Sequence, residues 1–316
     1  MNESPLAIGI DFGGTSIKMG LVRGKTVLKK GPIIKTQEAG RPDQLIDLIA
    51  RDVRLFQGEC DEVSAVGVGL PGLIDVDQGM VHILSNVRGW REIQLSKQLS
   101  EKIGLPVAIE NDANAMGYGE YLFGAGHGVD SLIALTLGTG VGAAVIINGQ
   151  LIRGGSMSAG ELGQTSIDWR GVHANYGNLG ALEKYVGNHQ IAERAAKAYS
   201  AAGQQRSLET CSPHHLSQWA DEGDAIANRI WMETGDMIGA ALANAAWLVN
   251  PTRFVIGGGV SKAGDLIFDP IRKSFESRVS PVIADNTEIV PAQLGTDAGM
   301  IGCAALGLEK AGCSAH

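Results

Sequence analysis

"IGIDFGGTSIKMGLV", residues 8–22, places an acid, two glycines and a hydroxyl between two apolar runs. The alternation on each side predicts two strands joined by a tight turn. Gly13 and Gly14 lack a Cβ, so an anion can approach the backbone N–H groups, and Thr15 adds a hydroxyl donor. Asp11, at the carboxyl end of the first strand, is suited to hold the water shell of Mg²⁺. The stretch fits either a phosphate- and metal-binding turn or a plain hairpin with a solvated aspartate.

The succession of strand, glycine turn, strand and hairpin occurs a second time, in SLIALTLGTGVGAAVIINGQLI, residues 131–152. Further on, TRFVIGGGVS (252–261) resembles the earlier VSAVGVGLPG (63–72). In the first copy the third strand is expected over residues 26–34. A duplicated α/β unit is the simplest account of this repetition.

The two copies predict two domains with a boundary just after Asp112. The N-terminal domain is expected to span residues 1–112 and the larger second domain residues 113–296, while a helix at about 297–316 returns to the first domain. Two stretches with helical spacing, GNHQIAERAAKAYS and DAIANRIWMETGDMIGAALANAAWLVN, are expected as long helices of the second domain.

Composition narrows the class of protein. The 316 residues carry a net charge of −8 and form no basic stripe, which disfavours a nucleic-acid binder. The apolar run over residues 132–147 is shorter than a bilayer span and is interrupted by Gly and Thr, so it predicts buried strand. Four scattered cysteines and the absence of a signal-peptide pattern predict reduced thiols in a cytoplasmic protein.

The second copy has a glycine turn of its own, Gly138, Thr139 and Gly140. Two such turns in duplicated halves predict one anion held from both sides of a cleft. Gly257–Gly259 follow an apolar strand and are expected to open a helix, which gives a third approach point for a phosphate or nucleotide. The spacings match neither a Walker A loop nor a Rossmann fingerprint.

Seven motifs carry a resemblance to a known family. DFGGTSIK, LPGLID, NVRGW, ENDANA, LGTGVG, AGELG and GGGV follow one another in the order typical of the ROK family of sugar kinases and related repressors, over roughly residues 6–308. The resemblance implies an α/β, duplicated ribonuclease-H-like fold of the actin and hexokinase type, with two domains around a cleft. It also implies ATP, Mg²⁺, a hexose-type substrate and a homodimer.

Asp112 follows an apolar strand and begins a helix, where a carboxylate can also serve as an N-cap worth about 1 kcal/mol. Asp112 resembles the Asp of the family's END motif, which acts as a general base for the sugar hydroxyl, as phosphoryl transfer requires. The resemblance therefore implies catalysis by Asp112. It implies sugar binding by side chains that hydrogen-bond hydroxyls, namely Asn86, Asn111, Asp112, Glu161, Gln164 and Glu183.

The expected nucleotide and metal contacts fall on the glycine turns. Asp11 is expected to hold Mg²⁺ through water. Lys18 is either a phosphate ligand or a solvated lysine on an edge strand. The full expected nucleotide set is Asp11, Gly13, Gly14, Thr15, Lys18, Gly138, Thr139, Gly140, Gly257, Gly258 and Gly259.

The pattern departs from the family at one place. Many members carry a zinc site made by a His after the GE pair and by a cysteine-rich run, but here Gln164 stands at the His position and Ala174, Tyr176 and Ala181 at the cysteines. Zinc requires about four nitrogen, sulfur or carboxylate ligands, so we expect no structural zinc. Gln164 has a different reach from His, so the identity of the sugar stays open.

Several functions remain open at this point. The first is an ATP-dependent kinase of glucose, with fructose, mannose, N-acetylglucosamine, N-acetylmannosamine and allose as other acceptors. The others are a polyphosphate-dependent glucokinase, a sugar-responsive repressor and a sugar-binding regulator without catalysis. Only five residues precede Leu6, which disfavours a DNA-binding repressor, and the presence of Asp11, Asp112 and Glu161 favours catalysis.

Overall fold

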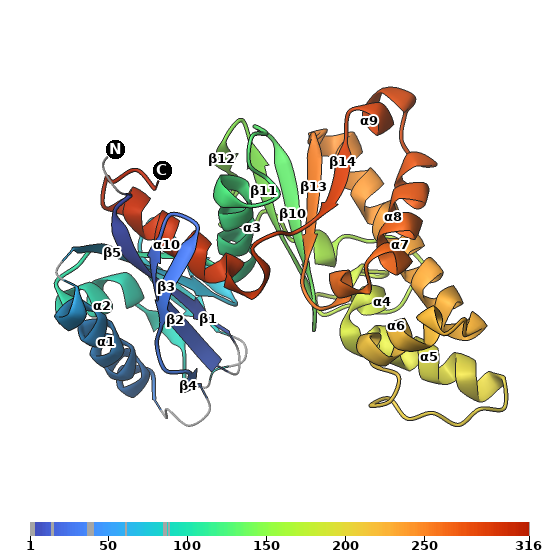
Figure 1. Cartoon of the computed structure of the whole chain (residues 1–316), viewed down its shortest axis with the longest axis horizontal. Helices are drawn as coiled ribbons and strands as arrows, with labels where there is room; N and C mark the ends of the chain where they lie inside the picture. Colours follow the sequence, from blue (N-terminus) through green and yellow to red (C-terminus); the bar gives the residue numbers. More distant parts are fainter. Residues whose placement is uncertain are drawn as a thin grey trace. The chain divides into compact units, whose positions relative to one another are not determined.

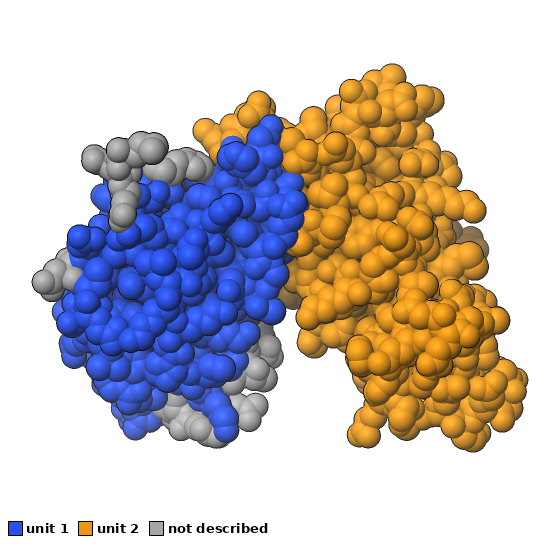
Figure 2. Space-filling view, viewed as in Figure 1, with its two compact units in different colours: residues 1–128, 151–159, 293–316 blue, residues 129–150, 160–292 orange. Residues whose placement is uncertain are grey.

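The computed structural model describes residues 4–13, 16–36, 41–60, 62–84, 87 and 89–315. The chain forms two compact units, coloured separately in Figure 2. The expected boundary after Asp112 lies inside the first unit, because the helix that begins there packs on the C-terminal helix of the same unit. The ranges are 1–128, 151–159 and 293–316 for unit 1, and 129–150 and 160–292 for unit 2.

Unit 1 is built on a sheet with the order β3-β2-β1-β5-β9, of which Figure 1 labels β1, β2, β3 and β5. β1 pairs antiparallel with β2 and parallel with β5, and β5 pairs parallel with β9. The strand expected over residues 26–34 is two strands, since Gly31 and Pro32 interrupt it and Pro has no N–H to donate. The elements of unit 1 are β1 (Leu6–Phe12), β2 (Ser16–Arg23), β3 (Thr26–Lys30), β4 (Ile34–Lys35), α1 (Pro42–Glu59), β5 (Val63–Leu70), β6 (Leu73–Asp75), β7 (Met80–Ile83), β8 (Arg91–Ile93), α2 (Leu95–Ile103), β9 (Val107–Asn111), α3 (Asp112–Phe123), the 3₁₀ turn η3 (Gly295–Asp297) and α10 (Ala298–Lys310).

The two faces of this sheet are covered by different helices. Ile8, Ile10 and Phe12 share one core with the apolar side chains of α1 and α2. On the other face α10 lies so close to β5 that a Cβ on Gly67 would fall 1.7 Å from the carbonyl oxygen of Cys303. Only glycine allows this backbone-to-backbone packing, and it fixes α10 beneath the carboxyl ends of β1 and β5.

Unit 2 repeats the sheet of unit 1, with the order β12-β11-β10-β13-β14. β10 pairs antiparallel with β11 and parallel with β13, which pairs parallel with β14. The duplication predicted from the sequence is confirmed, and each unit has the strand order of the ribonuclease H fold. The elements of unit 2 are β10 (Leu132–Leu137), β11 (Val141–Ile147), β12 (Gln150–Leu151), the 3₁₀ turn η1 (Leu162–Gln164), α4 (Glu183–Val186), α5 (Asn188–Ala201), α6 (Pro213–Asp221), α7 (Ala225–Val249), β13 (Arg253–Gly257), the 3₁₀ turn η2 (Val260–Ala263), α8 (Asp265–Glu276), α9 (Pro281–Asp285) and β14 (Glu288–Pro291).

The two long helices expected in the second half are present as α5 and α7, and the returning C-terminal helix is present as α10. Within the described ranges, no helix combines the length and the apolar character that crossing a membrane requires.

Candidate functional site

Unit 1 brings two aspartates to one edge of its sheet. β1, β5 and β9 run parallel, and their register places Asp11 beside Gly69 and Gly69 beside Glu110. Asp112 directly follows β9, so both carboxylates stand where parallel strands end. Their charges interact, because the Asp11 carboxylate contributes to a raised pKa of Asp112. Each negative charge disfavours the other, so this edge suits a cation beside one carboxylate and a base at the other.

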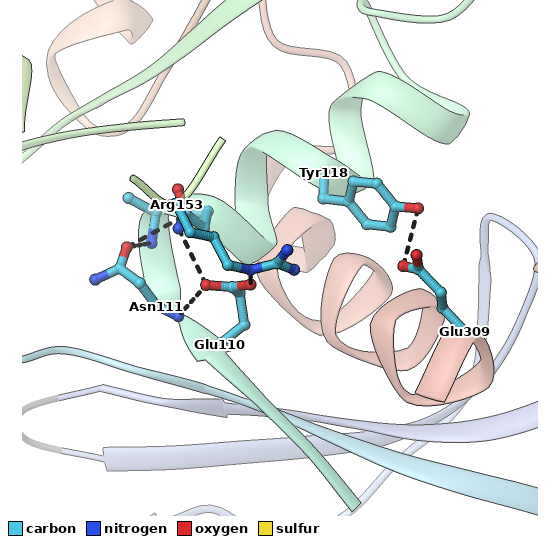
Figure 3. Close-up of polar contacts among 7 residues, drawn as sticks. Glu110, Asn111, Tyr118, Arg153 and Glu309 are labelled. Atoms are coloured by element: carbon cyan, nitrogen blue, oxygen red, sulfur yellow. Dashed lines mark hydrogen bonds and ion pairs between the residues drawn. The ribbon is translucent and has the colours of Figure 1, made fainter. Parts of the chain in front are cut away.

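Asp112 is the first residue of α3, and the cap of that helix is its neighbour. The Asn111 side-chain oxygen accepts hydrogen bonds from Ala113 N (3.0 Å) and Asn114 N (3.2 Å) (Figure 3). Asp112 Oδ1 accepts a further bond from Ala113 N at 2.9 Å. Within the described part of the chain no other residue donates a hydrogen bond to Oδ2, so this oxygen is the one that we expect to meet an incoming hydroxyl.

The environment raises the pKa of Asp112 above its ordinary value. Burial is the main cause and the nearby Asp11 adds to it, while the N–H of Ala113 acts in the opposite direction. A carboxylate that is harder to ionise is a stronger base once it is ionised. The N-cap role that a carboxylate could have had here belongs to Asn111 instead, which leaves Asp112 without a structural duty beyond one bond.

Asp11 faces the start of α10. A Cβ on Gly299 would lie 3.6 Å from its Cγ, so no side chain separates the carboxylate from that helix. Burial raises the pKa of Asp11, and the exposed Lys18, opposite it in the β1–β2 register, lowers it. A carboxylate whose charge is disfavoured by burial, with no side chain between it and α10, fits a hydrated Mg²⁺.

The turn after β1 is only partly described. Gly13 N donates to Ser16 O at 2.9 Å, so this N–H is used inside the turn. Gly14, Thr15 and Asn86, for which contacts with phosphate or sugar are expected, lie outside the described residues.

Unit 2 places its two glycine turns side by side. β10 and β13 are parallel neighbours, so the turn Gly138–Gly140 and the turn Gly257–Gly259 lie at the same edge of the sheet. Gly258 has φ +90°, and a Cβ there would fall 2.2 Å from the carbonyl oxygen of Leu137. Five of the six residues of these two turns are glycines, and Thr139 is the sixth, so little side-chain bulk keeps a phosphate from the backbone.

Two residues of unit 2 lie directly against these turns. Glu183, at the start of α4, accepts a hydrogen bond from Val141 N at 3.2 Å, and a Cβ on Gly140 would fall 2.4 Å from the same Oε2. Asn188 donates its backbone N–H to Gly138 O at 2.8 Å, and its side-chain nitrogen lies 4.0 Å from a Cβ placed on Gly259. Sequence analysis missed Asn188, although the Gly-Asn pair before a long helical stretch was a usable signal.

The expected sugar-binding residues of unit 2 gather around the start of β11. Glu161 immediately precedes the 3₁₀ turn η1, and a Cβ on Gly163 in that turn would fall 2.2 Å from Val141 O. Since Glu183 meets the N–H of the same Val141, the structure brings Glu161, Gln164 and Glu183 to one locality. Three polar side chains of this kind can bind several hydroxyl groups at once.

The loop between Gln164 and Glu183 is held by hydrogen bonds. Asn178 donates to the carbonyl of Gln164 at 2.8 Å, and the Tyr185 hydroxyl accepts from Val172 N at 3.1 Å. Short antiparallel bridges join Ser166 to Ala181 and His173 to Leu179. Across the described residues, no three His, Cys, Asp or Glu side chains are grouped so that they could hold a metal ion.

The duplicated fold with polar residues at the strand ends is that of the actin and hexokinase class. A model of the ROK family matches residues 7–310, and the chain belongs to the ROK family. It is 34% identical to a glucokinase of Thermotoga maritima, over 96% of this chain and 98% of that protein. It is 30% identical to a xylose repressor of Bacillus subtilis, over 96% of this chain and 77% of the repressor.

A solved structure extends the comparison to the fold. The structure is similar, with a TM-score of 0.80 and 34% identity, to a ROK family glucokinase from Streptomyces griseus in complex with glucose and AMPPNP. That similarity covers 96% of this chain and 99% of the other. The family resemblance expected from the seven motifs is confirmed.

Proposed function

We propose that this protein is an ATP-dependent sugar kinase with glucose as the expected acceptor. The observation that carries the proposal is the pair Asp11 and Asp112: one carboxylate suited to a hydrated cation and one with an oxygen available to a hydroxyl, at a single sheet edge. The similarity to glucokinases supports the same activity. Burial raises the pKa values of both carboxylates, and shifted pKa values cluster at catalytic sites, which favours a kinase over a protein that only binds sugar.

In the proposed reaction, Asp112 Oδ2 accepts the proton of the attacking sugar hydroxyl. Asn111 uses its oxygen to cap α3, which leaves its amide N–H groups as donors to a neighbouring hydroxyl. Asn86, Glu161, Gln164 and Glu183 complete the proposed sugar contacts. Once the sugar and ATP are oriented, phosphoryl transfer depends on the position of the sugar hydroxyl and on neutralising the negative charge that develops on the phosphoryl group.

The nucleotide contacts are proposed for the glycine turns of unit 2, with Gly14, Thr15 and Lys18 of unit 1. The glycine N–H groups of these two turns and the hydroxyl of Thr139 are suited to phosphate oxygens, although Gly138 N donates to Gly140 O at 3.0 Å within its own turn. Asp11 would hold Mg²⁺, which supplies positive charge to the transferred phosphoryl group. Because Glu183 lies against Gly140, the phosphates are proposed to meet the other side of that turn.

The identity of the sugar and of the phosphoryl donor is part of the same proposal. Gln164 stands where zinc-bearing members have a His, so fructose, mannose, N-acetylglucosamine, N-acetylmannosamine and allose are tested beside glucose. Polyphosphate is tested as a second donor. We propose that the protein carries no structural zinc, works in the cytoplasm as a homodimer and needs no nucleic acid.

A coupled ADP-release assay with ATP and Mg²⁺ over this sugar panel tests the proposal. We expect one sugar to turn over with kcat/KM of about 10⁴ M⁻¹s⁻¹ or better, with a sugar phosphate identified by ³¹P NMR. Sugar binding by calorimetry without any phosphoryl transfer from ATP or polyphosphate would contradict it and favour the regulator alternative, which the similarity to a xylose repressor makes worth testing.

A further inference from the structure

Glu110 is a buried carboxylate two residues before the proposed catalytic base. It lies in β9 with 2% of its surface exposed. Its Oε1 accepts hydrogen bonds from Asn111 N (2.9 Å) and from the Asn114 side-chain nitrogen (3.0 Å). Its Oε2 accepts from Arg153 Nε at 2.7 Å (Figure 3). One carboxylate thus joins the strand end, the first turn of α3 and a residue from a distant part of the sequence.

Arg153 comes from a segment with an unusual path. Residues 151–159 belong to unit 1, whereas the chain before and after them, 129–150 and 160–292, belongs to unit 2. The carbonyl of Arg153 accepts from Ala159 N at 3.0 Å, which closes the segment into a loop. Glu161, one of the proposed sugar ligands, follows that closure by only two residues.

The contact between Glu110 and Arg153 is an ion pair, so it depends on both charges. A buried carboxylate is tolerated when it is paired, and removing one partner leaves an uncompensated charge in a poorly solvated place. The ion pair therefore holds the 153–159 loop on β9 with a specificity that an apolar contact lacks. Neither Glu110 nor Arg153 is among the proposed binding or catalytic residues.

We propose that Glu110 and Arg153 are a positioning pair for the sugar kinase reaction, an inference that rests on the proposed function. Glu110 fixes the Asn111–Asp112 junction through two bonds and, through Arg153, fixes the loop that leads into Glu161. Loss of the pair loosens both groups of sugar contacts together. None of the proposed nucleotide contacts, in unit 1 or in unit 2, is a residue that the pair bonds, so we expect ATP binding to be insensitive to it.

The surroundings of the pair make it accessible to an experiment. Glu110 and Arg153 line a hollow of about 430 Å³ within unit 1, together with Lys97, Glu309 and Lys310. The Arg153 side chain is 30% exposed. A small cation added in solution can therefore reach the place of the guanidinium group when that group is removed. The charges around the hollow are mixed in sign, so it selects no anionic or cationic ligand of its own.

The test compares E110Q, R153M and R153K with the wild-type enzyme. E110Q keeps an acceptor for Asn111 N and Asn114 but loses the ion pair, and R153K keeps the charge without the planar fork of arginine. We expect E110Q and R153M to lower kcat/KM for the sugar by about tenfold or more and to change KM for ATP by less than about twofold, with R153K between R153M and the wild type. The double variant should be no worse than R153M, because the two side chains act as one unit.

Two controls separate positioning from mere folding. Y118F removes a hydrogen bond of 3.3 Å to Glu309 from the same helix α3, and we expect it to leave all kinetic constants unchanged. Methylguanidinium should restore sugar turnover in R153G but not in E110Q, a rescue that a misfolded variant would not show. Sugar kinetics of E110Q and R153M equal to wild type would overturn the proposal.

Failure of the proposed function would be recognised separately, because the wild-type enzyme would then phosphorylate no sugar. In that case hydrogen exchange still tests the pair: E110Q and R153M should speed exchange in the peptide covering residues 154–160, and Y118F should not. Unchanged exchange in E110Q and R153M would overturn the positioning role whatever the reaction.

Discussion

Glu120 offers the sharpest prediction about the integrity of unit 1. It lies fully buried in α3, and its carboxylate accepts from Ala125 N at 2.8 Å, Gln293 N at 3.0 Å and Leu294 N at 2.7 Å. The last two belong to the segment that returns from unit 2 and leads into α10. A single carboxylate therefore ties the end of α3 to the start of the C-terminal return.

The expected loss follows from these bonds. Hydrogen bonds to a charged acceptor contribute about 1.5 kcal/mol or more each, so E120A, which removes three, should lower the stability of unit 1 by about 4 kcal/mol. Since about 1 kcal/mol corresponds to roughly 2–4 °C in a chain of this size, Tm should fall by on the order of 10 °C. E120Q keeps one oxygen for Gln293 and Leu294 and should lose about 1–3 kcal/mol at Ala125.

Differential scanning calorimetry and hydrogen exchange measure the two effects. In E120A the amides of Gln293 and Leu294 should exchange faster, ahead of any global change. E101Q, at an exposed Glu101 whose nearest cation is 4.0 Å away, is the control and should change stability by less than about 0.5 kcal/mol. Unchanged exchange at residues 293–294 together with an unchanged Tm in E120A would refute the reasoning.

The remaining predictions concern the catalytic edge, the packing of α10, the sugar loop and zinc. The raised pKa of Asp112 means that its ionised form opposes folding, so the contribution of Asp112 to stability is most favourable below about pH 3.9 and is lost as the pH rises through the folded pKa. D112N should therefore have a higher Tm than wild type at pH 7–8, and this difference in Tm should shrink as the pH falls toward 4. A lower Tm of D112N at pH 8 would contradict this. In a urea titration, G67A should lower the free energy of unfolding by about 3 kcal/mol or more, because its Cβ would strike the Cys303 carbonyl. The control G58A in α1, with open space around its Cβ, should be neutral or stabilising in the same titration. N178A should cost about 1 kcal/mol locally by releasing the Gln164 carbonyl, which should raise KM for the sugar and leave KM for ATP unchanged in steady-state kinetics. Elemental analysis of protein purified without chelator should find substoichiometric zinc; one zinc per chain would show that ligands other than those of the family motif bind it.

Much of the fold could be predicted because the decisive patterns are local. The alternation around Asp11, repeated around Gly138, predicted two sheets of the same kind, and the spacing in α5 and α7 predicted those helices. The break at Gly31 and Pro32 was missed, although proline in an expected strand was a warning. The path of residues 151–159 carries no local pattern, because it is fixed by an ion pair between residues far apart in the sequence.

The candidate site was predictable to the level of residue type, less so to the level of contact. Position at a strand end marked Asp11 and Asp112. It could not show that Asn111 caps α3, that Gly13 N–H is used within its own turn, or that Glu183 meets the turn at Gly140. Those facts depend on which of several equally suitable hydrogen-bond partners lies closest after folding. Glu110 was overlooked because nothing in its neighbourhood along the chain reveals its partner Arg153.

The central claim is that Asp112 activates a sugar hydroxyl toward ATP. The most direct test follows transfer of ³²P from γ-labelled ATP to glucose, and to any other sugar active in the panel, by wild-type protein and by D112N prepared side by side. The D112N variant can keep the bond from Ala113 N while presenting an amide to the hydroxyl, so the fold is retained and the base is lost. The account predicts transfer by the wild type and a loss of about 10²-fold or more, roughly 3 kcal/mol, in a D112N variant that is folded. Turnover by D112N within about threefold of wild type would contradict it.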